Sequence, residues 1–153
     1  MGVAVPGMED AVDSTQSEVR ALLDRQSEAM RTKDIDRLMS IYSPDVVYFD
    51  VVPPLQYAGA TALRGRFLQW FDGWKGSIGM EIRDLSIVAS GDIAVAHWLS
   101  RASGTLSNGQ EVGSWVRATS CCQRSNDTWV ITHEHVSWPV DSRSQTAAMD
   151  LVP

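Results

Sequence analysis

The first third of the chain carries apolar residues at helical spacing. They recur from Val19 to Met30, directly after TQSE, a sequence of the capping-box type. We therefore expect an amphipathic helix over residues 15–32, preceded by a flexible arm over residues 1–13. A second, short helix should follow Asp34, which can cap it, and should end before the turn sequence SPD.

Beyond this point the pattern changes to β-branched and aromatic runs. VVYFD (46–50) predicts a strand, and a third helix over about 60–74 should bury one wide apolar stripe. The remaining runs are rich in Val, Ile, Trp and Thr and are separated by the turn-like sequences SGD, SNGQ and RSND. They predict four long strands, over 78–90, 92–106, 110–124 and 128–138.

This order of elements predicts an α+β domain. Helices should cover one face of a strongly curved, mostly antiparallel sheet, because consecutive strands joined by tight turns form hairpins. We place a single domain over residues 14–140. The tail over residues 141–153 is polar, and we expect it either to be mobile or to fold over the mouth of a cavity.

Composition narrows the possible partners. The chain has 153 residues, 44% of them hydrophobic and 21% charged, with a formal net charge of −6. An acidic chain without a Lys/Arg cluster disfavours nucleic acid and anionic membranes as partners. The sequence has neither an apolar run of membrane-spanning length nor a secretory signal, so we expect a cytoplasmic protein. Cys121 and Cys122 are adjacent and lack the spacing of a redox pair, so we expect two reduced structural thiols.

Two stretches resemble a known family. AMRTKDIDRLMSIYSPDVVYFDVVPPLQYAGATALRGRF and the later WVITHEHVSWP are similar to the nuclear transport factor 2-like superfamily, in its SnoaL-like and ketosteroid-isomerase-like branch. The resemblance covers about residues 15–140. It implies a cone, in which a bent sheet wraps around three helices and encloses a pocket. We expect this pocket to work without a cofactor. It also implies a homodimer formed through the outer face of the sheet.

The resemblance makes Asp50 a candidate general base. In ketosteroid isomerases an Asp after the same helix–turn–strand passage moves a proton next to a carbonyl, and an apolar pocket suits that task. The alternative is a turn Asp that caps backbone groups before VVPP. The isomerase's Tyr and protonated Asp have no counterparts: the first helix holds no Tyr, its matching position falling near Gln26, and no acid occurs between Glu111 and Asp127.

Other polar residues are candidates for the missing donors. A strict period of two puts Arg117 and Thr119 on one face with Trp115 and Cys121. It also puts His133 and His135 on one face of the last strand, together with Trp129, Ile131 and Ser137. The resemblance suggests that this second set faces inward. Arg117 would then hold an oxyanion, and the two histidines would act as acid, base or donor. The alternatives are a surface cation and structural histidines.

Histidine also raises the possibility of a metal. Three histidines with Asp50 offer the residue types of a site with two histidines and one carboxylate. However, HEHVSWPVD lacks the Glu that follows His-x-His in cupin-like barrels, and helices precede the sheet, so we expect no metal. His97 is expected to be a core or interface histidine, with a role in the cavity as the alternative.

The aromatic content suggests the ligand. Six tryptophans in this length favour a flat, apolar compound such as a polyketide-, terpenoid- or steroid-like ring. The residues expected to bind it are Tyr48, Trp74, His97, Trp115, Thr119 and Ser137. We expect acid–base chemistry on a carbonyl-containing ring, as an isomerase or lyase. The alternative is a ligand-binding or association domain of the same fold without catalysis.

Overall fold

The structure is a computed structural model that describes residues 7–153. The helices are α1 (Met8–Thr32), α2 (Ile35–Met39) and α3 (Ala60–Asp72). The strands are β1 (Tyr42–Phe49), β2 (Tyr57–Ala58), β3 (Trp74–Ser90), β4 (Ile93–Leu106), β5 (Glu111–Ser125), β6 (Thr128–Ser137), β7 (Val140–Asp141) and β8 (Thr146–Ala147). None of the helices in residues 7–153 is long and apolar enough to cross a membrane.

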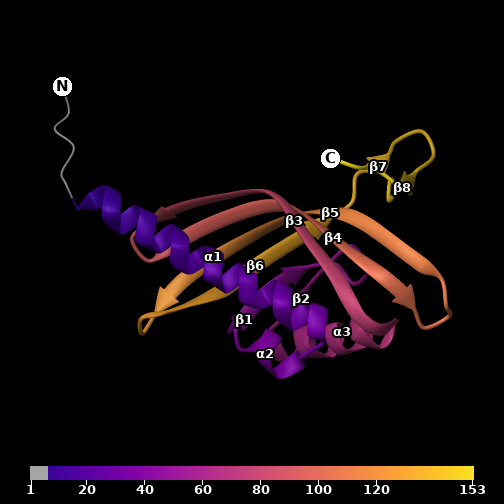
Figure 1. Ribbon diagram of the computed structural model, residues 1–153, viewed down its shortest axis with the longest axis horizontal. Coiled ribbons are helices and arrows are strands. Elements are labelled where there is room, and N and C mark those ends of the chain that lie inside the picture. The colour runs from indigo at the N-terminus through magenta and orange to yellow at the C-terminus, as the bar shows by residue number, and fades with distance from the viewer. Residues whose placement is uncertain (1–6) are drawn as a thin grey trace.

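Six strands form one curved sheet in the order β2-β1-β6-β5-β4-β3. All neighbours pair in antiparallel fashion except β1 and β6, which run parallel. Figure 1 shows the long strands bending across α1, with α2 and α3 gathered at one end and the small β7–β8 hairpin near the C-terminus. The expected α+β fold with a curved, mostly antiparallel sheet is therefore confirmed.

The core lies between the helices and the concave face of this sheet. Leu22 and Leu23 of α1, Leu63 of α3 and Ile131 of β6 are fully buried. Phe67 of α3 packs among them and is 5% exposed. Each such side chain contributes about 1.5–3 kcal/mol of hydrophobic stabilisation, so the apolar stripes of α1 and α3 hold the helices on the sheet.

Two details of the helices differ from the sequence expectation. α1 begins at Met8, so Thr15 lies inside the helix rather than at its cap. Glu18 closes no capping box, because its carboxylate accepts a hydrogen bond from Nε1 of Trp129 at 2.6 Å. Of the expected arm, residues 1–6 lie outside the described residues. The expectation that helices precede the sheet holds only for α1 and α2, because α3 follows β1 and β2, in the order that the apolar pattern predicted.

A β-bulge interrupts the pairing of β5 with β6. Cys122 lies opposite Ile131, but Cys121, the residue before it on β5, lies opposite His133. Thr132 is therefore an extra residue on β6, and its hydroxyl donates a hydrogen bond to the carbonyl of Cys121 at 3.2 Å. A single extra residue reverses the alternation of faces along a strand.

The burial of β6 shows this reversal. Before the bulge, Trp129 and Ile131 are buried, whereas after it Glu134 is buried and His135 is exposed. The inward set is therefore Trp129 and Ile131, followed by Glu134 and Val136. This shift decides which side chains of the strand can reach the interior of the cone.

The C-terminal tail folds back against the sheet. The N–H of Ala148 donates to the carbonyl of Pro139 at 2.8 Å, and the Ser114 hydroxyl donates to the carbonyl of Met149 at 3.0 Å. Nε1 of Trp138 in turn donates to the Ser114 hydroxyl at 2.9 Å. The tail therefore contacts the sheet at Ser114 of β5.

Candidate functional site

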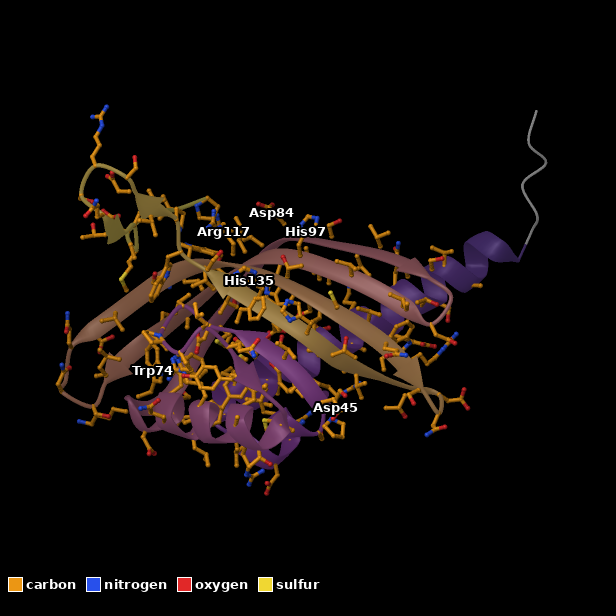
Figure 2. All side chains as sticks on the ribbon, turned by 180° about the vertical axis from the view of Figure 1, so that it is seen from behind. Asp45, Trp74, Asp84, His97, Arg117 and His135 are labelled. Atoms are coloured by element: carbon orange, nitrogen blue, oxygen red, sulfur yellow. The ribbon has the colours of Figure 1, made fainter. Side chains whose placement is uncertain are left out.

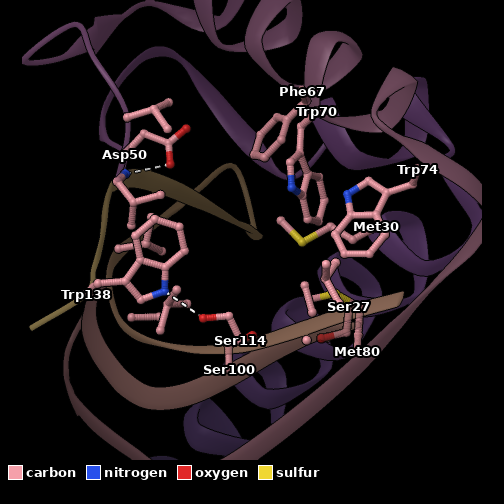
Figure 3. A pocket seen from close by; sticks show the side chains of 18 of the residues that line it. Ser27, Met30, Asp50, Phe67, Trp70, Trp74, Met80, Ser100, Ser114 and Trp138 are labelled. Carbon is pink, nitrogen blue, oxygen red and sulfur yellow. Dashed lines mark hydrogen bonds between the residues drawn. The ribbon is translucent and has the colours of Figure 1, made fainter. Parts of the chain in front are cut away.

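A cavity of about 620 Å³ opens between α1, α3 and the concave face of the sheet. This volume suits a ligand of one to a few rings. Four tryptophans line it, together with apolar residues such as Phe67 and Val136. Figure 3 shows Trp70 and Trp74 on one side of the cavity, and Trp138 and Asp50 on the other. The cavity is therefore mostly apolar, and its few polar groups stand out.

The first polar group is an ion pair. Nε of Arg66 donates to Oδ2 of Asp50 at 2.6 Å, and the two side chains are only 13% and 10% exposed. The backbone N–H of Val51 donates to Oδ1 of Asp50 at 2.7 Å. Asp50 directly follows β1, and Arg66 comes from α3, so the pair joins the sheet to the helix at the cavity wall.

The second polar group is a network around Glu134. Nε2 of Gln26 donates to both carboxylate oxygens at 2.9 Å. The Tyr42 hydroxyl donates to Oε1 at 3.0 Å, and the Ser120 hydroxyl donates to Oε2. Four elements, α1, β1, β5 and β6, thus meet at one carboxyl group that is 2% exposed. Burial raises the pKa of Glu134, although the hydrogen bonds donated to it oppose this rise.

Tyr48 lies between these two groups. It is the cross-strand partner of Glu134 and stands two residues before Asp50, so its side chain points to the same face as both. The residue is 5% exposed, yet its hydroxyl makes no hydrogen bond within residues 7–153. Burial raises the pKa of Tyr48 well above its ordinary value, and the nearby charges of Glu134 and Asp50 add to the rise. The phenol is therefore a protonated donor in the cavity wall.

Three of the expected site residues are brought together here. Tyr48, Asp50 and Trp74 all line the cavity. The other expected residues do not line it: His97, Trp115, Arg117, Thr119, His133, His135 and Ser137.

These seven lie on the outer face of the sheet. Figure 2 views the sheet from the side opposite α1 and shows His97, Arg117 and His135 there, whereas Trp74 lies between the sheet and α3. The prediction that the histidine set faces inward is wrong, because the bulge at Thr132 separates it from Trp129 and Ile131.

On β5 the prediction grouped the residues correctly and chose the wrong face. Ala118 and Ser120 are buried on the inner side, which leaves Arg117 and Thr119 outside with Trp115. Nε of Arg117 donates to the Ser137 hydroxyl at 3.1 Å, on the same outer face.

On the outer face the two histidines flank one aromatic ring. The ring of Phe49 lies edge-on to His133 and His135, with centroid distances of 4.7 and 5.3 Å. Nδ1 of His133 lies 2.7 Å from the carbonyl oxygen of Val47 on the parallel strand β1. These contacts give both histidines packing partners away from the cavity.

The residues considered for a metal are not assembled into one site. Asp50 faces the cavity, whereas His97 and His135 lie on the opposite side of the sheet. His133 lies on that outer side as well, because it follows the bulge at Thr132 and contacts Phe49. No group of three or more His, Cys, Asp or Glu residues in the described part of the chain could hold a metal ion. Cys121 and Cys122 form no disulfide, and burial raises the pKa of Cys122 to about 12.

The sequence interpretation missed Gln26, Arg66 and Glu134 as site residues. The sequence pattern indicated two of them. Gln26 interrupts the apolar stripe between Leu23 and Met30, where a polar residue needs a buried partner. On β6, apolar residues occur on both alternation sets, which indicates a change of phase within the strand. No sequence pattern indicated Arg66, because its pairing with Asp50 forms only when α3 packs against β1.

The chain is similar in sequence and structure to known proteins. The family described as SnoaL-like domain matches the chain over residues 19–141. A solved NTF2-like protein of unknown function from Pseudomonas putida KT2440 is 33% identical, with a TM-score of 0.84 over 92% of this chain and 98% of that one. No curated protein matches the chain.

Two more distant structures share the fold. A nuclear transport factor 2 (NTF2-like) superfamily protein from Salmonella enterica is 17% identical, with a TM-score of 0.74 over 85% of this chain and 94% of that one. A ketosteroid isomerase-like protein from Erwinia carotovora is 18% identical, with a TM-score of 0.69 over 79% of this chain and 93% of that one.

Proposed function

The chain belongs to the SnoaL-like domain family, and we propose that its cavity binds a small hydrophobic ring compound with a carbonyl group and moves a proton on it, as an isomerase or lyase. One observation carries this proposal: a carboxylate, Asp50, is held at the wall of an apolar cavity near the hydroxyl of Tyr48, which makes no hydrogen bond within residues 7–153. A base near a free donor is the combination that proton abstraction next to a carbonyl requires.

The proposed reaction assigns a role to each group. Asp50 accepts the proton from the carbon next to the carbonyl, and the electron pair of that C–H bond forms a carbon–carbon double bond while the π pair of the carbonyl moves onto its oxygen to give an enolate. Tyr48 donates a hydrogen bond to the oxygen as this charge develops. Arg66 positions the carboxylate. An isomerase then returns the proton to another carbon of the ring system, and a lyase expels a leaving group from the neighbouring carbon.

Tyr48 takes the place of the donors expected from the sequence. Arg117, His133 and His135 lie across the sheet from the cavity, so they do not reach a ligand bound there. Their assigned part in stabilising the oxyanion therefore passes to Tyr48, which comes from β1 rather than from the first helix.

The experiment measures the first half of the reaction directly. A panel of cyclic ketones and enones is incubated with the protein in D₂O, and deuterium incorporation next to the carbonyl is followed by NMR. Asp50→Asn should lower the exchange rate by about 100-fold or more, as expected when a general base is removed, while ligand affinity stays within a few-fold. Asp45→Asn is the matched control, because Asp45 lies on the same strand with an exposed side chain.

One observation favours a function without catalysis. Both oxygens of Asp50 already accept hydrogen bonds from the protein, as expected of a purely structural ion pair. A ligand-binding or association domain would bind members of the panel with no deuterium exchange above the level of Asp50→Asn. That result would contradict the proposed proton transfer and leave the binding function standing.

We also propose that two copies associate through the outer face of the sheet. Val88 and Val95 are cross-strand partners on that face and are 67% and 39% exposed, and Ile93 beside them is 60% exposed. Exposed apolar residues gathered on neighbouring strands are typical of a protein interface.

A further inference from the structure

The four tryptophans of the cavity come from four different parts of the fold. Trp70 belongs to α3, Trp74 begins β3, Trp98 lies on β4, and Trp138 directly follows β6. The rings of Trp70 and Trp74 stand at 80° to each other with centroids 6.0 Å apart, so they form a corner rather than a stack. Figure 3 shows Met30 beside this corner. The face of an indole ring is the strongest attractor of cations among aromatic side chains.

The charged side chains of the cavity wall also favour a cationic ligand. Asp50, Glu111 and Glu134 contribute three carboxyl groups, and Arg66 is the one basic side chain in the described wall. Nε of Arg66 donates to Asp50, so the positive charge of Arg66 is already balanced by that carboxylate. The remaining carboxyl groups of the described wall have no basic partner within the wall, so acidic groups are in excess.

Glu134 also favours a cationic ligand. Its hydrogen-bond partners are an amide and two hydroxyls, and no basic side chain of residues 7–153 lies within hydrogen-bond distance of it. A buried carboxylate without a cation is costly, and a cation bound nearby offsets that cost. Gln26, which holds Glu134, lies one helical turn from Met30 on α1, and Met30 stands beside the tryptophan corner, so Glu134 and the corner line the same cavity on the side of α1.

We propose that the ligand of this cavity is a cation, a flat ring compound that carries a protonated or quaternary amine. The ammonium group lies against the corner of Trp70 and Trp74 on the side of Glu134, and the ring body extends toward Tyr48 and Asp50. This inference rests on the proposed function of the cavity and names the class of its substrate.

Three naphthalene probes of closely similar size test the proposal by isothermal titration calorimetry. They are the cation (2-naphthylmethyl)trimethylammonium, its neutral isostere 2-neopentylnaphthalene, and the carboxylate anion of 2-naphthaleneacetic acid. The cation should bind at least about tenfold more tightly than the neutral isostere, and the anion should bind most weakly. Equal or tighter binding of the neutral probe would overturn the cation proposal and leave the hydrophobic cavity intact. Binding of none of the three would overturn both.

Variants locate the preference within the cavity. In Trp70→Leu and in Glu134→Gln, the ratio of the two dissociation constants, neutral over cationic, should fall several-fold. Trp115→Leu should leave the ratio unchanged, because Trp115 lies on the outer face. The ratio is internal to each variant, so a general loss of stability does not mimic the effect. An unchanged ratio in both cavity variants would contradict the proposed position.

Proton release gives an independent readout. Because burial raises the pKa of Glu134 above its ordinary value of 4.5, its carboxyl is partly protonated near pH 4.5, and a cation that binds beside it at that pH should displace a proton. Titrations in two buffers with different enthalpies of ionisation should therefore show proton release with the cationic probe and none with the neutral one. Release that persists in Glu134→Gln would assign the proton to another group and contradict the role of Glu134.

Discussion

Tyr48 and Glu134 face each other across the parallel strands β1 and β6, and both side chains reach the cavity. The polar groups of the two side chains differ in their hydrogen bonding. The Glu134 carboxyl accepts hydrogen bonds on both oxygens, whereas the Tyr48 hydroxyl makes none within the described residues. One member of the pair is therefore held by the protein, and the other is free to contact a ligand.

Tyr48→Phe should lower the rate of deuterium exchange by about 100-fold, as expected when one donor to a developing oxyanion is removed. The free energy of unfolding should change by less than about 1 kcal/mol, because the lost hydroxyl has no protein partner. NMR exchange rates and urea unfolding measure the two effects. Tyr57→Phe is the control, since the Tyr57 hydroxyl donates to the carbonyl of Pro53 and Tyr57 does not line the cavity. Equal rates for Tyr48→Phe and wild type would exclude Tyr48 as the donor.

Arg66→Gln should destabilise the fold by about 3 kcal/mol, because it leaves the Asp50 carboxylate without its cation at a site only 10% exposed. The double variant Asp50→Asn with Arg66→Gln should recover part of the loss, since no unpaired charge remains. Urea unfolding of the three variants forms a double-mutant cycle. Additive losses in that cycle would show that the ion pair is not coupled.

Glu134 makes stability depend on pH. Its pKa is higher in the folded protein than its ordinary value of 4.5, so the folded state holds the proton more tightly than the unfolded state. Its contribution to the free energy of unfolding is therefore present at low pH and is lost as pH rises from about 4.5 through the folded-state pKa.

The difference in unfolding free energy between wild type and Glu134→Gln should accordingly shift with pH. The variant should gain relative stability between pH 5 and pH 8, as measured by urea unfolding at each pH. A difference that stays constant over this range would contradict the raised pKa.

The proposed homodimer is tested on the exposed valines of the outer face. Val95→Lys should raise the dissociation constant of a dimer at least tenfold, because it places a charge in an apolar contact. Sedimentation velocity over a range of concentrations measures this change. Leu68→Lys on α3 is the control, since Leu68 is exposed on a helix instead of the sheet. A wild-type protein that sediments as a monomer at every concentration would contradict the proposal.

The sequence predicted the elements well and the faces of the last strands poorly. Apolar spacing placed the third helix within two residues of α3 and the long strands within a few residues of β3 to β6, because burial periodicity is a local property. The start of α1 was missed, since Glu18 pairs with Trp129, more than a hundred residues away, instead of closing a capping box.

The candidate site was predicted in part for the same reason. Asp50, Tyr48 and Trp74 were found from local pattern and resemblance. His133 and His135 were assigned to the wrong face, because a strict period of two does not hold through the bulge at Thr132. Pairing register is a relationship between strands, so periodicity in a single strand does not determine it.

The position of Met149 bears on how relatives of this protein differ. Met149 lines the cavity and is held there through Ser114, yet it lies beyond residue 141, where the match to the family ends. Part of the cavity rim is thus encoded outside the sequence that defines the family. Evolution can therefore exchange the last residues of such a chain and alter which molecules the cavity admits, while the shared domain and its Asp50–Arg66 ion pair stay unchanged.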